Sequence, residues 1–121
     1  MRSWPSLLVV SGLWMGLPAC KDKGAVDTAT LDPECRTLTW DDYGEGYLRS
    51  WCGGCHSSAV PTEGRAGAPE GVDFDTHDGL LEHLDRVQAR ATGDAPTMPP
   101  VGGADAEERE RFALWLDCGA P

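Results

Sequence analysis

The most informative stretch of this chain is Cys52-Gly53-Gly54-Cys55-His56. It places two thiols three residues apart, with a histidine directly after the second thiol. The chain contains 5 Cys and 3 His among 121 residues, and at these frequencies chance would produce the pattern only about 0.005 times. We therefore interpret the stretch as a functional motif.

This spacing is the one that covalent haem attachment requires. Cys52 and Cys55 lie on one side of a helical turn, where their sulfurs can form thioethers with the two vinyl groups of a porphyrin. The imidazole of His56 is then carried to the iron as its proximal ligand. Gly53 and Gly54 let the backbone lie close against the macrocycle because they have no side chains. We predict one covalently attached haem c.

Two other chemistries use closely spaced cysteines. A redox CxxC should follow a strand in a βαβ unit, and no such pattern surrounds the motif. A structural zinc site needs a second close pair of ligands, whereas His77 and His83 are six residues apart. A redox dithiol and half of a zinc site remain the alternatives to haem.

The N-terminal residues predict export. Arg2 precedes an apolar run over residues 7–17, which is too short to span a bilayer and indicates a signal peptide over residues 1–19. The Leu-Pro-Ala-Cys sequence that ends at Cys20 resembles the lipobox of bacterial lipoproteins. That resemblance implies that Cys20 is acylated and begins the mature chain. The alternative is an ordinary secretory signal.

The mature chain then divides into a tether and a domain. Residues 20–31 are polar and unpatterned after Cys20, which indicates a flexible tether, and residues 32–121 form the domain. We expect an exported lipoprotein, anchored to a membrane of the bacterial cell envelope and facing the periplasm. A domain of this length has a small core, so an enclosed porphyrin would supply much of its apolar filling.

Two cysteines are left after these assignments. Cys20 is assigned to lipid, and Cys52 and Cys55 to haem, which leaves Cys35 and Cys118 near the two ends of the domain. In an oxidising compartment we expect them to form a disulfide. The alternative is two separate buried thiols.

Hydrophobic periodicity predicts an all-α domain of three to four helices with long Gly/Pro loops. The first helix should run from Trp40 to Cys55 after an N-cap at Thr39. Its apolar face should comprise Trp40, Tyr43, Tyr47, Leu48 and Trp51. Gly44 and Gly46 weaken this helix and therefore indicate a close crossing by another helix.

Two further helices are predicted downstream. The second should span residues 77–91, with Asp75 or Thr76 as its cap. Its inward-facing residues should be Leu80, Leu84 and Val87. The last should span residues 106–117 after an Asp105-x-x-Glu108 capping pattern. It should present Phe112, Trp115 and Leu116 to the first helix.

Residues 57–73 and 92–103 are rich in Gly and Pro and are predicted loops. Met98, in the second loop, is the only methionine outside the signal peptide, and its thioether can supply the sixth iron ligand opposite His56. A core methionine, or His77 or His83 as sixth ligand, remains an alternative. We expect both of these histidines to be solvated.

His56 should donate the proton of its other ring nitrogen to a backbone carbonyl, which would fix its tautomer and strengthen it as a ligand. The loop near Pro61 is the expected source of that carbonyl.

Together these features resemble the monohaem class I cytochromes c. The resemblance covers residues 39–117 and is carried by Cys52, Cys55 and His56 after a helix, by a middle helix, by Met98-Pro99-Pro100 in a loop, and by a last helix containing Trp115. It implies that the first and last helices cross and that the haem lies between His and Met. The Cys35 and Cys118 pair, the long loop after His56 and the absence of lysine from the domain depart from the family.

Charge constrains the partners. From Leu31 onward the chain has 18 acidic residues and 7 arginines. Nucleic acid is therefore not an expected partner, because its phosphates would be repelled. A redox partner that docks here should be basic at the contact.

We find no catalytic constellation, so the sequence predicts an electron carrier. One alternative is a haem peroxidase or ligand sensor with a displaceable Met98. The other is a lipoprotein without haem that is stabilised by disulfides or zinc.

Overall fold

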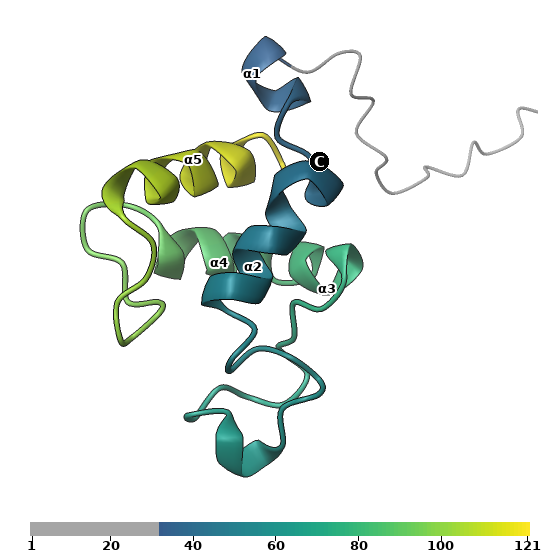
Figure 1. The fold of residues 1–121 in the computed structure, drawn as a ribbon, viewed down its shortest axis with the longest axis vertical. Coiled ribbons are helices and arrows are strands. Elements are labelled where there is room, and N and C mark those ends of the chain that lie inside the picture. Colours follow the sequence, from purple (N-terminus) through teal and green to yellow (C-terminus); the bar gives the residue numbers. More distant parts are fainter. Residues whose placement is uncertain (1–31) are drawn as a thin grey trace, which may run out of the picture.

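The computed structural model describes residues 32–121, and in this part of the chain all regular structure is helical (Figure 1). The elements in chain order are α1 (Pro33–Arg36), the π-helical turn η2 (Trp40–Gly44), α2 (Glu45–Trp51), the 3₁₀ turn η3 (Thr62–Gly64), α3 (His77–Leu81), α4 (Leu84–Ala91) and α5 (Ala106–Asp117). The all-α prediction is confirmed. The signal peptide, Cys20 and the tether lie outside the described residues.

Within residues 32–121, no helix is both long enough and apolar enough to cross a membrane.

The helix that contains the predicted aromatic face begins as a π-helical turn. Thr39 caps it as predicted, because its hydroxyl accepts a hydrogen bond from the Asp42 amide at 3.1 Å. The Thr39 carbonyl accepts from the amides of both Tyr43 and Gly44. This shared acceptor makes the turn wider than that of an α-helix.

The same helix ends earlier than predicted. α2 stops at Trp51 and Cys52 is its C-cap, so the expected continuation to Cys55 was wrong. Gly53 and Gly54 explain the difference, since glycine is about 1 kcal/mol less favourable than alanine in a helix interior. The cysteine-histidine motif therefore lies on turns that follow the helix.

The predicted close crossing of the first and last helices is confirmed at Gly44. A Cβ atom at Gly44 would overlap the indole ring of Trp115 in α5. Gly46 faces open space, with nothing within 4 Å of its would-be Cβ atom, so the expectation that it also marks the crossing was wrong. Figure 1 shows α5 lying across the upper end of α2.

The last helix has the predicted bounds, from residue 106 to residue 117. Its cap is also as predicted, because the Asp105 side chain accepts from the Glu108 amide at 3.0 Å. Phe112, Trp115 and Leu116 are buried. The ring of Tyr47 in α2 stacks on Phe112 with a centroid distance of 4.0 Å, which joins the two helices through the centre of the core.

The middle helix is two helices rather than one. Thr76 caps α3 as predicted, and Leu80 and Val87 are buried, but the chain leaves helical geometry at His83 between α3 and α4. The ring of His83 contacts the Gly71 carbonyl at 3.3 Å and lies edge-on to Phe74. These tertiary contacts explain the break, since residues 82 and 83 are not helix breakers.

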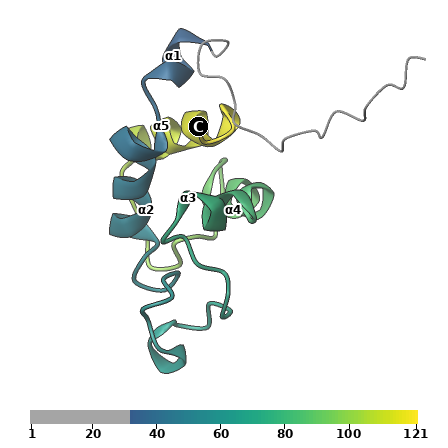
Figure 2. The ribbon, with the colours of Figure 1, turned by 90° about the vertical axis from the view of Figure 1, so that its right-hand side faces the viewer.

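The predicted aromatic face stops short of Trp51. Tyr47 and Leu48 are buried, whereas Trp51 is 39 % exposed, so its assignment to the core face was wrong. The largest fully buried side chains are Trp115, Phe112, Leu48, Leu80 and Leu116. The core thus lies where α2, α3, α4 and α5 meet (Figure 2).

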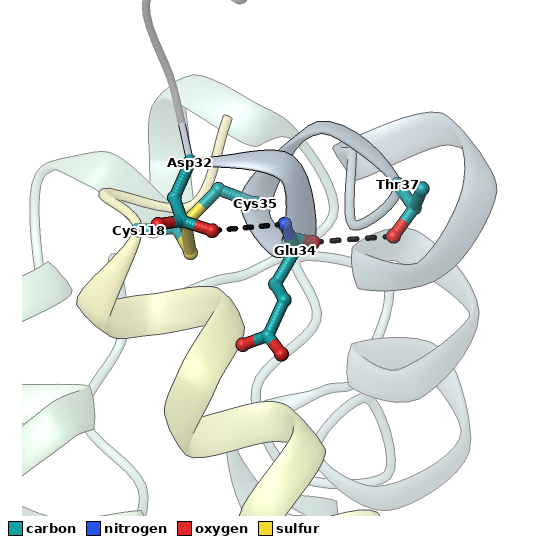
Figure 3. The surroundings of a disulfide bond; sticks show 5 residues. All are labelled: Asp32, Glu34, Cys35, Thr37 and Cys118. Atoms are coloured by element: carbon teal, nitrogen blue, oxygen red, sulfur yellow. Dashed lines mark hydrogen bonds between the residues drawn. A yellow bond between two sulfur atoms is a disulfide. The ribbon is translucent and has the colours of Figure 1, made fainter.

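The predicted Cys35–Cys118 disulfide is present, with 5.6 Å between the two Cα atoms. It joins α1 to the C-cap of α5 (Figure 3). α1 buries none of its residues. It is held locally by the Asp32 carboxylate, which accepts from the Glu34 amide at 3.1 Å. The disulfide therefore links α1 covalently to the end of α5.

The C-terminal residues pack back onto the start of η2. The Trp40 amide donates to the Pro121 carbonyl at 2.6 Å. His77 Nε2 contacts the Ala120 carbonyl at 2.6 Å, and its ring stacks on Trp40. His77 and His83 are both half-buried, so the expectation that they are solvated was wrong.

Candidate functional site

The motif residues form a tight turn at the end of α2. The carbonyl of Cys52 accepts from the amide of Cys55 at 3.1 Å and from that of His56 at 2.9 Å. This turn therefore carries the side chains of Cys52, Cys55 and His56. Cys52 and Cys55 are free thiols and are not bonded to each other.

His56 has the backbone carbonyl partner that the sequence predicted. Its Nδ1 lies 2.9 Å from the carbonyl oxygen of Val72. A carbonyl only accepts, so Nδ1 carries the proton and the Nε2 lone pair is left available to a ligand. The expected location near Pro61 was wrong, because Val72 lies at the far end of the same loop.

The loop returns to His56 because it is closed by backbone contacts. The Phe74 amide donates to the His56 carbonyl at 2.9 Å. The Phe74 ring stacks on the imidazole with centroids 4.8 Å apart and an interplanar angle of 21°. Phe74 thus covers one face of the imidazole and helps to fix the plane of the ring.

A second hydrogen bond links the turn after His56 to the residues just before α3. The carboxylate of Asp75 accepts from the Ser58 amide at 2.6 Å. Hydrogen bonds from Ser57 and Ser58 lower the pKa of the Asp75 carboxyl below its ordinary value. The residues on both sides of the turn are therefore held in place.

The loop between α2 and α3 is organised around Arg65, which the sequence reasoning did not single out. Arg65 is only 2 % exposed, although the loop projects from one end of the molecule (Figure 2). The guanidinium donates to four backbone carbonyls and to one carboxylate. The acceptors are Ser57 O (2.7 Å), Ala68 O (3.3 Å), Pro69 O (2.9 Å), Val72 O (3.3 Å) and Asp73 Oδ1 (2.5 Å).

The backbone of this loop is shaped to turn those carbonyls inward. Ala66 and Gly67 have positive φ angles of 51° and 87°, and Gly71 has a φ of 80°. Such angles reverse the chain within a few residues, and glycine adopts them readily. The only sequence signal for this arrangement was a single arginine among Gly, Ala and Pro residues.

A cavity of about 320 Å³ lies beside His56. Leu48 and Phe74 supply apolar wall, and His56 supplies an imidazole. Glu45 and Arg49, which form an exposed ion pair along α2, lie at its rim. Ser57 and Asp75 add polar lining, so the cavity combines apolar and polar surface with one nitrogen ligand.

The environment of Cys52 favours the neutral thiol. Burial, together with a smaller effect of the neighbouring Cys55, raises the pKa of this thiol to about 11. The attacking cysteine of a redox CxxC instead has a lowered pKa, because the thiolate is the nucleophile. The environment of Cys52 thus argues against the redox dithiol.

The structure does not bring Met98 to His56. Met98 is 37 % exposed and is not among the residues that line the cavity. Its loop is attached elsewhere, because the amides of Thr97 and Met98 both donate to the Arg90 carbonyl at the end of α4. Cys52, Cys55 and His56 are grouped as the sequence predicted, and Met98 is apart from them.

Across residues 32–121, no group of three or more His, Cys, Asp and Glu side chains is arranged to hold a metal ion.

A scan of protein-family models gave no match to this chain, and searches of curated proteins and of solved structures gave none either.

Proposed function

We propose that this protein binds one haem c and transfers electrons. In this proposal Cys52 and Cys55 form the thioethers and His56 is the proximal iron ligand. The observation that most supports this proposal is a hydrogen bond of His56, which directly follows the CxxC pair. Its Nδ1 lies 2.9 Å from the carbonyl oxygen of Val72. That hydrogen bond is typical of imidazoles that ligate metals, because it leaves Nε2 as the donor atom and raises its basicity.

The residues around His56 fit such a group. Neither of the two thiols next to it is in a disulfide, and burial holds the pKa of Cys52 well above its usual range. The cavity beside the imidazole has apolar wall from Leu48 and Phe74. The Phe74 ring stacked on His56 would hold the imidazole plane fixed while a ligand binds at Nε2.

When bound, haem supplies one-electron redox chemistry at its iron. The protein's own residues would bind it and orient the proximal imidazole. No general acid, base or nucleophile is required, because no bond is made or broken in the substrate. This is consistent with the absence of a catalytic constellation from the sequence.

The decisive experiment is to express the full chain with haem-attachment machinery. Wild-type protein should give a haem-staining band on a denaturing gel that survives acid-acetone extraction. The Cys52→Ala/Cys55→Ala variant should give none. The Cys35→Ala/Cys118→Ala variant is the matched control, since it also removes two cysteines but should retain the band. Extractable or absent haem in the wild type would overturn the proposal.

A ligand-binding or peroxidatic role is the second candidate, and the position of Met98 favours it. A methionine that stays 37 % exposed and outside the cavity would not supply the iron with a second protein ligand. The carrier proposal instead requires Met98 to be that ligand.

Carbon monoxide separates the two candidates. If Met98 ligates the iron, the reduced wild-type protein should bind carbon monoxide weakly, and Met98→Ala should bind it readily and have a lower reduction potential. His83→Ala is the control and should change neither. Ready binding by the wild type, with a spectrum unaffected by Met98→Ala, would favour the ligand-binding role.

The remaining parts of the proposal concern location and partners. Acylation at Cys20 would anchor the domain to a membrane of the cell envelope, since several acyl chains on one residue bind stably. The chain has a formal net charge of −10 at pH 7. A redox partner with a basic docking surface is therefore favoured by charge complementarity.

A further inference from the structure

We infer that Arg65 is a positioning residue for His56 and acts through the Val72 carbonyl. This inference rests on the proposed role of His56 as an iron ligand, although the contacts that carry it belong to the protein alone. The Val72 oxygen accepts from His56 Nδ1 at 2.9 Å and from Arg65 Nη2 at 3.3 Å. One carbonyl thus links the imidazole to the guanidinium.

Both contacts can exist together, because a carbonyl oxygen has two lone pairs. The shorter contact is the one with His56, so Arg65 supports the hydrogen bond to the imidazole without replacing it. The longer contact gives the Val72 oxygen a second partner. The carbonyl therefore keeps its direction even though it lies in a loop without regular structure between η3 and α3.

Arg65 is suited to this role because its planar guanidinium holds several acceptors in fixed directions. Its Nη1 atom binds the Ser57 carbonyl directly after His56. Its Nη2 atom shares two protons among the Asp73 carboxylate and the carbonyls of Pro69 and Val72. It therefore joins the two chain segments that meet at the imidazole. A lysine could keep the charge at this position, but it could not reproduce the fork.

The charge of Arg65 is balanced locally. Asp73 accepts from Nη2 at 2.5 Å, and the arginine side chain is only 3 % exposed. An ion pair of this kind has little net field at a distance, so the influence of Arg65 on His56 is geometric. Removing the fork should weaken the hydrogen bond at Nδ1, because water can then compete for that proton.

Arg65→Lys tests this inference, with exchange of the His56 Nδ1 proton with solvent, measured by NMR, as the first readout. The proton is the same whether or not Nε2 binds iron. Its exchange should be roughly 2- to 10-fold faster in the variant, which corresponds to the net loss of one hydrogen bond. Exchange of the Leu116 amide in α5 should be unchanged.

The reduction potential of the haem-bearing protein is the second readout. Arg65→Lys conserves charge, so a shift reports the hydrogen bond and not the electrostatic field. The potential should rise, because a weaker bond at Nδ1 makes the imidazole a poorer donor and stabilises the ferric state less. Arg86→Lys, on the exposed surface of α4, is the matched control and should change neither readout.

If Arg65→Lys does not fold, Asp73→Asn takes its place. That variant keeps an oxygen acceptor but removes the charge that holds the guanidinium, so the exchange rate should rise by a smaller factor. Unchanged Nδ1 exchange in a folded variant would overturn the inference and leave the haem proposal intact. Wild-type protein without attached haem would overturn the haem proposal, while the exchange measurement would still decide the role of Arg65.

Discussion

At the scale of single residues, the pair Gly44 and Gly46 shows how differently two similar glycines can act. Both lie in the same helical segment and both reduce its intrinsic helix propensity. Gly44 allows the Trp115 indole to pack directly against the backbone, whereas a Cβ atom at Gly46 would meet nothing within 4 Å. One glycine is required by packing, and the other only lowers helix stability.

We therefore predict opposite effects for two identical substitutions. Gly44→Ala should lower the free energy of unfolding by about 1–3 kcal/mol, because the added methyl group overpacks the helix crossing. Gly46→Ala should raise it by up to about 1 kcal/mol, because the site is open and helical. Urea denaturation of the two variants and the wild type measures both changes. Equal effects of the two substitutions would contradict the crossing.

The residues also show what a sequence can predict about a site. The CxxCH spacing is local, so the grouping of Cys52, Cys55 and His56 follows from the chain itself. The partner of His56 at Val72 and the position of Arg65 depend on how a 17-residue loop without periodicity folds back. No pattern in the sequence encodes that path, although the need for a carbonyl at Nδ1 could be predicted from imidazole chemistry.

At the scale of elements, helix ends were predicted well where side chains cap them and poorly where packing decides. Thr39, Thr76 and Asp105 each cap a helix as expected. The break at His83 and the π-helical turn at η2 arise from tertiary contacts instead. The hydrophobic periodicity of the sequence would be nearly the same if the helix were unbroken at His83 and regular at η2.

The cap of α5 gives a prediction at this scale. Asp105→Ala should destabilise the protein by about 1 kcal/mol, because the amide of Glu108 loses its acceptor at the start of the helix. Asp105→Asn is the matched control and should be nearly neutral, since asparagine caps as well as aspartate. Thermal unfolding followed by circular dichroism distinguishes them. A similar loss in both variants would point to the charge of Asp105 and away from its hydrogen bond.

At the scale of the whole molecule, the disulfide closes almost the entire domain. Cys35 and Cys118 are 83 residues apart in sequence. On the chain-entropy model a loop of this size stabilises the folded state by about 4–5 kcal/mol. The pairing could be predicted from the odd number of cysteines and their assignment, without any knowledge of the fold.

The attachment of α1 by the disulfide has a mechanical consequence. A force applied at Asp32 enters the fold through Cys35 and passes directly to Cys118, so it bypasses the core. Pulling the domain between residues 32 and 121 should therefore extend only the short segments outside the bridge. Reduction should release the enclosed 83 residues, a gain of roughly 270–300 Å in contour length at 3.3–3.6 Å per residue. An optical-tweezers trace with that full gain before reduction would contradict this load path. A domain held to a surface by its N-terminal side would then be protected from tension by one covalent bond.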